Sequence, residues 1–173
     1  MNDLERAPAP PLTSRLRNGT RLPPFTLPSS RGHALGPGSY RQRKHLALVM
    51  LDPTTPAGRT YLTALAHLYP EFQEMDTEVL ALLPVAAEAL GAWVADLALP
   101  FLALADDGTT RARLLPAGAP TTAAGALVAD RYGILAFQSL GTSLAAVDPP
   151  EEILAWVRAI GMQCSECADY PDS

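Results

Sequence analysis

The sequence is poor in cysteine, since Cys164 and Cys167 are the only two in 173 residues. They lie three positions apart near the C-terminus and cannot cross-link distant segments, which excludes a disulfide-stabilised scaffold. Basic residues are also few, because 13 lysines and arginines stand against 18 acidic residues and give a net charge of −5. Binding to a nucleic-acid backbone needs clustered cations, so we expect no nucleic-acid partner.

Long hydrophobic runs are missing as well. No apolar stretch reaches the ~20 residues that a membrane-spanning helix needs. Residues 1–6 are mostly polar and lack the apolar region of a secretion signal. We therefore expect no membrane partner and a cytoplasmic location.

Histidine is scarce, and its spacing carries no metal-binding pattern. His33, His45 and His67 are scattered along the chain and form no motif in which two ligands share a helix face. A structural zinc site takes four ligands. The histidines therefore predict no metal site, and we expect no cofactor.

Apolar residues, by contrast, make up 48% of the chain, enough for one core. Residues 45–51 form a continuous apolar run, which predicts a buried central strand. Similar patterns predict strands at 78–83, 101–105, 124–129 and 134–140, helices at 59–75, 86–98 and 150–160, a small hairpin around 29–32, and irregular structure at 109–120. Because strands and helices alternate before a final hairpin, we predict an α/β fold with a mixed central sheet and helices on both faces.

The pattern divides the chain into three parts. Residues 1–20 hold several prolines and no periodic apolar pattern, which predicts a flexible N-terminal arm. Residues 21–160 have the length of a single domain. Residues 161–173 follow the last predicted helix as a C-terminal tail that contains the Cys-x-x-Cys pair.

Five segments, taken in order, resemble the peroxiredoxins, the alkyl hydroperoxide reductase and thiol-specific antioxidant (AhpC/TSA) family. They are residues 19–28 with their Phe-Thr-Leu, the loop after Leu51, residues 68–72, residues 127–134 and residues 152–157. The resemblance implies a thioredoxin-like fold. It also implies a redox, antioxidant function of the kind found in thiol-dependent peroxidases and oxidoreductases.

In that family the chemistry is carried by a Pro-x-x-x-Thr-x-x-Cys loop and a remote arginine. Here Thr55 matches the threonine, Pro53 lies two residues out of register with the proline, and Gly58 stands at the place of the cysteine. The arginine is expected six residues before Asp130, where this sequence has Ala124. A peroxidatic thiol reacts as a thiolate, and a neighbouring hydroxyl cannot replace it. We therefore expect no conventional peroxidase turnover, and the sequence leaves open whether another enzymatic activity remains.

Two functions stay open. In the first, thiol–disulfide chemistry resides in Cys164 and Cys167, with a thiol reductant or a protein as partner; their spacing also suits two metal ligands or no specific role. In the second, the chain is a non-enzymatic thioredoxin-fold binding module that uses the vestigial active-site helix start. Arg59 stands beside that start, where it either helps free N–H groups to bind an anion or is a solvated surface residue.

The predicted strand at 134–140 indicates a homodimer. It carries little charge that would block edge-to-edge pairing, and a second copy on this edge would also bury Phe137. The alternative is that the N-terminal arm, or the hairpin at 22–35, covers the same edge within one chain.

Overall fold

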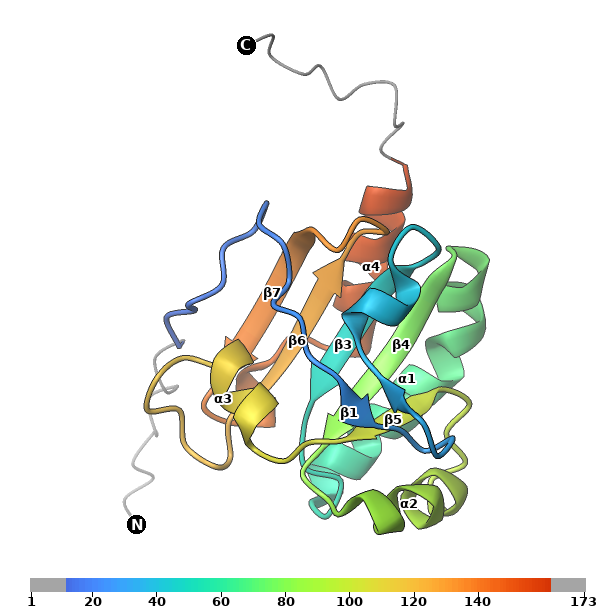
Figure 1. The fold of residues 1–173 in the computed structure, drawn as a ribbon, viewed down its shortest axis with the longest axis vertical. Coiled ribbons are helices and arrows are strands. Elements are labelled where there is room, and N and C mark those ends of the chain that lie inside the picture. Colours follow the sequence, from blue (N-terminus) through green and yellow to red (C-terminus); the bar gives the residue numbers. More distant parts are fainter. Residues whose placement is uncertain (1–11, 163–173) are drawn as a thin grey trace, which may run out of the picture.

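A five-stranded mixed sheet forms the centre of the protein (Figure 1). The computed structural model describes residues 12–162. In spatial order the strands are β5 (Leu102–Ala105), β4 (Thr77–Leu83), β3 (His45–Met50), β6 (Ala124–Ala129) and β7 (Leu135–Gly141). Strands β3, β4 and β5 run parallel, whereas β6 is antiparallel to both β3 and β7. The predicted mixed sheet, with the first long strand at its middle, is therefore confirmed.

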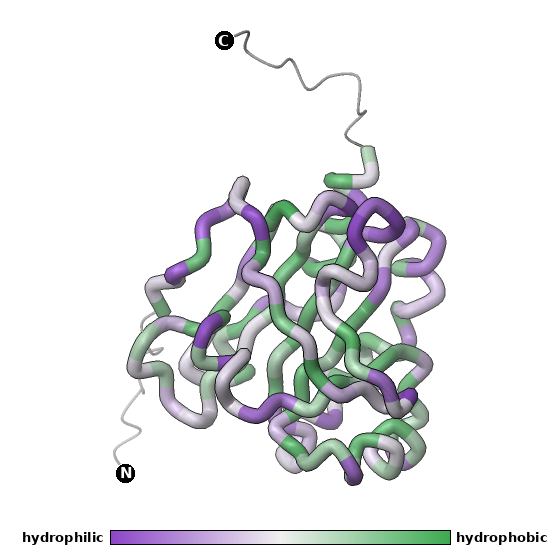
Figure 2. Tube along the Cα trace, in the orientation of Figure 1, coloured by the Kyte–Doolittle hydropathy of each residue, from purple (hydrophilic) through white to green (hydrophobic). Residues whose placement is uncertain are grey.

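Strand β3 is central because both of its faces are apolar. Leu46, Leu48 and Met50 pack into one hydrophobic cluster, while Ala47 and Val49 pack into another on the opposite face. All six residues of the strand are buried. Figure 2 shows the same pattern along the chain, with hydrophobic residues on the central strands and hydrophilic residues on many of the turns.

Three helices pack into the cluster of Ala47 and Val49. They are α1 (Pro56–Glu74), α2 (Leu90–Asp96), which follows a 3₁₀ turn at Ala87–Ala89, and α4 (Pro150–Gly161). Helix α1 buries the stripe that its spacing predicts, at Leu62, Leu65, Tyr69 and Phe72. In Figure 1, α1 and α4 pass behind the sheet. None of the helices in residues 12–162 is long and apolar enough to span a bilayer.

The other face is covered by α3 (Thr109–Leu114) and by the hairpin of β1 (Leu27–Pro28) and β2 (Ala34–Leu35), which lie in front of the sheet in Figure 1. Short 3₁₀ turns complete the described elements at Pro37–Tyr40 and Leu144–Ala146. The hairpin is the predicted one, with Leu27 paired to Leu35. Helices on both faces of a mixed sheet are thus confirmed.

The prediction of irregular structure at 109–120 is wrong for its first half, where α3 forms. Two carboxylates start this helix: Asp106 Oδ1 accepts hydrogen bonds from the backbone N–H groups of Gly108 and Arg111, at 3.0 and 3.4 Å, and Asp107 Oδ1 accepts one from Thr109 at 2.9 Å. Side-chain acceptors of this kind satisfy the orphan donors of a helix start. With only six residues, α3 is too short to display a helical apolar period in the sequence.

The N-terminal segment runs beside the start of β7. Leu135 O accepts a hydrogen bond from Gly19 N at 2.7 Å, and Leu135 N donates to Thr20 O at 2.9 Å. Further along the strand, Gln138 Nε2 donates to Leu16 O at 3.0 Å. Residues 16–20 therefore occupy part of the sheet edge that a second copy was expected to cover, and the homodimer stays a prediction.

Candidate functional site

The loop that leads into α1 is held by a closed set of local hydrogen bonds. Asp52 Oδ1 accepts from Thr54 N at 2.8 Å and from Thr54 Oγ1 at 2.6 Å. Thr55 is the N-cap, and its Oγ1 donates to Asp52 O and accepts from Gly58 N, both at 3.0 Å. Pro53 is buried between these residues. The N–H group of Gly58 is therefore already engaged by a side chain of the chain itself.

Gly58 lies where the resemblance places the peroxidatic cysteine, and the structure leaves no room there for a side chain. A Cβ atom built on Gly58 would lie 1.9 Å from the carbonyl oxygen of Asp52 and 3.0 Å from Thr55 Oγ1. Non-bonded heavy atoms do not approach within 3 Å of a Cβ without a shift, and the first contact is with backbone. The loop conformation thus requires glycine at this position.

Arg59 points toward α2 and makes its contacts there. Its Nη1 lies 3.0 Å from Asp96 Oδ2, and its guanidinium carbon lies 5.1 Å from the ring centroid of Trp93. A salt bridge and a cation–π contact thus engage the guanidinium with α2. Both charged side chains are about half exposed, so the pair contributes at most about 1 kcal/mol to stability. This placement favours the surface interpretation of Arg59 over a role in holding an anion at the helix start.

The family's remote arginine has no counterpart at Ala124, which is a buried residue at the start of β6. A different guanidinium, that of Arg111 on α3, contacts the loop that precedes β6. Arg111 Nη2 donates to Thr121 O at 3.4 Å, whereas its Nη1 is buried without a hydrogen-bond partner in the described residues. Burial lowers the pKa of Arg111, and the charges of Asp106 and Asp52 oppose this effect, so the guanidinium lies within electrostatic range of the Asp52 loop.

Sequence reasoning missed Arg111 because it placed no helix at 109–120. The available signal was the Asp106-Asp107 pair before Gly108, a carboxylate-rich helix start. Asp106 is itself buried, and this burial raises the pKa of its carboxyl group. Hydrogen bonds from the backbone N–H groups of Gly108 and Arg111 act against burial and lower the pKa of Asp106.

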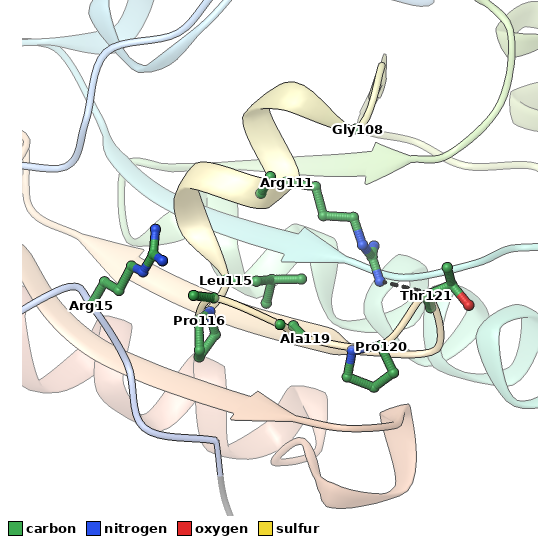
Figure 3. Close-up of a pocket in the computed structure, with 11 residues that line it drawn as sticks. Arg15, Gly108, Arg111, Leu115, Pro116, Ala119, Pro120 and Thr121 are labelled. Atoms are coloured by element: carbon green, nitrogen blue, oxygen red, sulfur yellow. Dashed lines mark hydrogen bonds between the residues drawn. The ribbon is translucent and has the colours of Figure 1, made fainter.

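Arg111 also lines a cavity of about 450 Å³ between α3 and the loop at 116–121 (Figure 3). Arg15, from the N-terminal segment, lies on the other side of the cavity, and the Arg111 side chain points toward Thr121. The remaining lining is largely apolar and includes Leu115 and Pro120. An apolar cavity with few polar groups is the usual form of a small-molecule site.

A second cavity, of about 720 Å³, lies between α4 and the β6–β7 turn. Its lining includes His45, which is 5% exposed and whose Nδ1 has no hydrogen-bond partner in residues 12–162. Burial lowers the pKa of His45, and the nearby Arg131 lowers it further, against the opposing charges of Asp130 and Asp76. Both effects favour the neutral form of the imidazole. An unpaired buried polar atom of this kind costs about 1–3 kcal/mol.

The predicted site residues thus fall into separate groups. Pro53 and Thr55 lie in the loop before α1 and Gly58 lies in the first turn of that helix, while the Arg59 side chain is turned toward α2. Cys164 and Cys167 lie outside the described residues. Within residues 12–162, no group of three or more histidine, cysteine, aspartate or glutamate side chains is arranged to hold a metal ion.

The sequence matches the AhpC/TSA family over residues 18–138. No curated protein matches it. Among solved structures, peroxidoxin BcpB from Mycobacterium tuberculosis is similar, with a TM-score of 0.71 and 18% identity over 84% of this chain and 99% of that one.

Two further structures are similar at comparable identity. Peroxiredoxin Q from Xanthomonas campestris has a TM-score of 0.66 and 15% identity over 79% of this chain and 91% of that one. A cysteine-to-serine mutant of peroxiredoxin 6 from Arenicola marina has a TM-score of 0.71 and 16% identity over 84% and 73%. At such identities the likeness concerns the fold, and it confirms the predicted thioredoxin-like architecture.

Proposed function

Because this chain belongs to the AhpC/TSA family, we propose that it is a peroxiredoxin-like redox protein without a peroxidatic cysteine, whose thiol–disulfide chemistry resides in Cys164 and Cys167. The observation that carries the proposal is the contact between Gly58 and Asp52. With 1.9 Å between a Cβ on Gly58 and the Asp52 carbonyl oxygen, the start of α1 is built around the absence of a side chain. The two C-terminal thiols are then the only thiols that the sequence offers.

The proposed step is a dithiol–disulfide exchange. The thiols of Cys164 and Cys167 together lose two electrons and two protons and form one intramolecular S–S bond. A disulfide on the reaction partner takes up the electrons and protons and becomes two thiols. A Cys-x-x-Cys spacing suits such a pair because the ring that closes is short.

The test is the thiol state of the full chain before and after treatment with oxidised glutathione. Mass spectrometry should find that the oxidised protein loses two hydrogens and that one S–S bond joins Cys164 to Cys167. Cys164→Ser and Cys167→Ser should each abolish that intramolecular bond, and a thiol reductant should restore both thiols in the unchanged protein. A protein that keeps two free thiols, or that forms only mixed disulfides with glutathione, would overturn the proposal.

A non-enzymatic binding module is the second candidate, and Arg111 is the observation that favours it. The start of α1 itself offers little, because Thr55 occupies the Gly58 N–H group and α2 engages Arg59. Arg111 Nη1 has no hydrogen-bond partner in residues 12–162, and the Arg111 residue lines the cavity of about 450 Å³, where its guanidinium is suited to an acidic ligand. In this function a variant that lacks both cysteines binds its ligand as tightly as the unchanged protein. A cytoplasmic location, which we also propose, fits either function.

A further inference from the structure

The large apolar side chains that remain exposed in residues 12–162 gather around one hollow. They are Tyr132, Trp156 and Met162, with exposed fractions of 53%, 38% and 78%. Tyr132 and Trp156 line the cavity of about 720 Å³, and Met162 directly follows Gly161, another lining residue. Exposed apolar groups that cluster in this way mark binding surfaces, whereas scattered ones carry no such meaning.

Trp156 gives the hollow a flat wall of fixed orientation. Its indole stacks on the ring of Phe137 from β7, with the ring centroids 5.1 Å apart and the planes 23° apart. Stacking restrains the indole plane before any ligand arrives, so little side-chain freedom is lost on binding. A cavity of this volume accommodates a small molecule.

His45 supplies a polar group at the same place. It lies at the start of β3 with its side chain among the cavity-lining residues, and Nδ1 is buried without a partner in the described residues. Buried polar atoms in native structures normally have a partner, and an exception calls for an explanation. Because Nδ1 has almost no accessible surface, a ligand in the cavity would provide the missing hydrogen bond once the imidazole turns toward the hollow.

Arg131 sets the sign of the charge that the hollow accepts. In residues 12–162 no carboxylate lies within 4.0 Å of its guanidinium, since the salt bridges there involve other cations. The neighbouring Asp130 directs Oδ1 to the backbone N–H groups of Tyr132 and Ile134, at 2.8 and 2.9 Å. The carboxylate of Asp130 is thus partly compensated within the turn, and Arg131 remains available for an anionic group.

We propose that this hollow binds a small, flat organic acid, with its apolar ring against Trp156 and its carboxylate at Arg131 and His45. The proposal is independent of the thiol chemistry of Cys164 and Cys167. The ring would replace water on the exposed faces of Trp156 and Tyr132. The carboxylate would make charge-assisted hydrogen bonds with the guanidinium and accept the N–H of the neutral imidazole.

The test uses the full chain labelled with ¹⁵N, with 2-naphthoate as the probe and 2-naphthamide as its uncharged counterpart. The sequence has two tryptophans, Trp93 and Trp156, so a Trp93→Phe variant assigns both indole N–H signals. Naphthoate should shift the Trp156 signal saturably and leave the Trp93 signal in place, while naphthamide should bind more weakly. Arg131→Gln should weaken binding about tenfold, as expected for one lost charge-assisted contact.

Arg113→Gln is the matched control, because it removes the same charge from an exposed position on α3 outside the cavity lining. It should leave naphthoate binding unchanged. His45→Asn should weaken naphthoate binding without altering the rest of the spectrum. If His45→Asn unfolds, the effect of Arg131→Gln on binding tests the proposal by itself. The proposal is overturned if naphthoate leaves the Trp156 signal unmoved, or if Arg131→Gln and Arg113→Gln act alike. A Trp156 shift on concentrating the protein without any probe would also overturn it, because a second copy would then fill the hollow.

Discussion

The carbonyl oxygen of Asp52 occupies the place where a side chain on Gly58 would begin, 1.9 Å from the Cβ position. The same carbonyl accepts the Thr55 hydroxyl, which in turn caps the Gly58 N–H group. Loop, cap and glycine therefore form one unit.

Gly58→Ala should lower the free energy of unfolding by about 1–3 kcal/mol, the usual cost of forcing an extra group into a packed site. Gly91 is the matched control, since it lies in the first turn of α2 with no heavy atom within 4 Å of its Cβ position. Gly91→Ala should be neutral or stabilise the protein by up to about 1 kcal/mol, because alanine favours helices. Urea unfolding measures both changes, and equal effects of the two substitutions would contradict the steric argument.

Peroxide consumption in the presence of dithiothreitol should not exceed that of buffer without protein. The reason is that neither Gly58 nor Ala124 can supply the thiolate and the guanidinium of the family's peroxidase chemistry. A related enzyme with an intact cysteine loop serves as the positive control. Saturable turnover that Cys164→Ser abolishes would show instead that the C-terminal thiols have taken over peroxide reduction.

Acidification should destabilise the protein through His45. Burial, and then Arg131, hold the pKa of the folded-state imidazole below its ordinary value of 6.5. Above pH 6.5 both states are neutral and the stability is complete, whereas below it the unfolded chain takes up the proton first. The free energy of unfolding should then fall by up to about 1.4 kcal/mol per pH unit until the folded-state pKa is reached.

Urea unfolding at pH 7.5 and 5.5 checks this dependence. His45→Asn should remove it, while His67→Asn, at an exposed position on α1, should retain it. An unchanged pH dependence in His45→Asn would assign the effect to other groups.

A homodimer paired through β7 should have the mass of two chains at micromolar concentration. The edge of that strand carries little charge, although Gly19 and Thr20 already pair with Leu135 at its start. Light scattering over a concentration series measures the mass. A single-chain mass that does not change on concentrating the protein would mean that residues 16–20 protect the edge within one chain.

The fold could be predicted because its main signals are local. The apolar run that became β3 needs burial on both faces, and Asp130 and Gly133 define a turn through their own backbone: the Asp130 carboxylate accepts two N–H groups, and Gly133 has a φ of +80°. The apolar pattern did not predict helix α3, because this helix is marked in the sequence by the carboxylates of Asp106 and Asp107 at its start and not by an apolar period.

The candidate sites were less predictable because they depend on tertiary contacts. The absence of a cysteine at Gly58 is visible in the sequence. The steric block by the Asp52 carbonyl is not, because it is a backbone contact that does not depend on the residue type at position 52. Arg111 depends on α3. In the sequence His45 is only the first residue of a predicted apolar strand. Packing of α4 and the β6–β7 turn brings it into one cavity with Trp156 and Arg131.

The Asp52–Gly58 contact also bears on the evolution of this chain. A single mutation that restored cysteine at position 58 would meet a backbone carbonyl before it could restore any chemistry. The conformation of the loop at Asp52 would have to change first. That change alone would break the hydrogen bonds of the Thr55 cap and would not provide peroxidase activity. The two alterations must therefore occur together, which makes the departure from the peroxidase motif a step that selection cannot readily reverse one residue at a time.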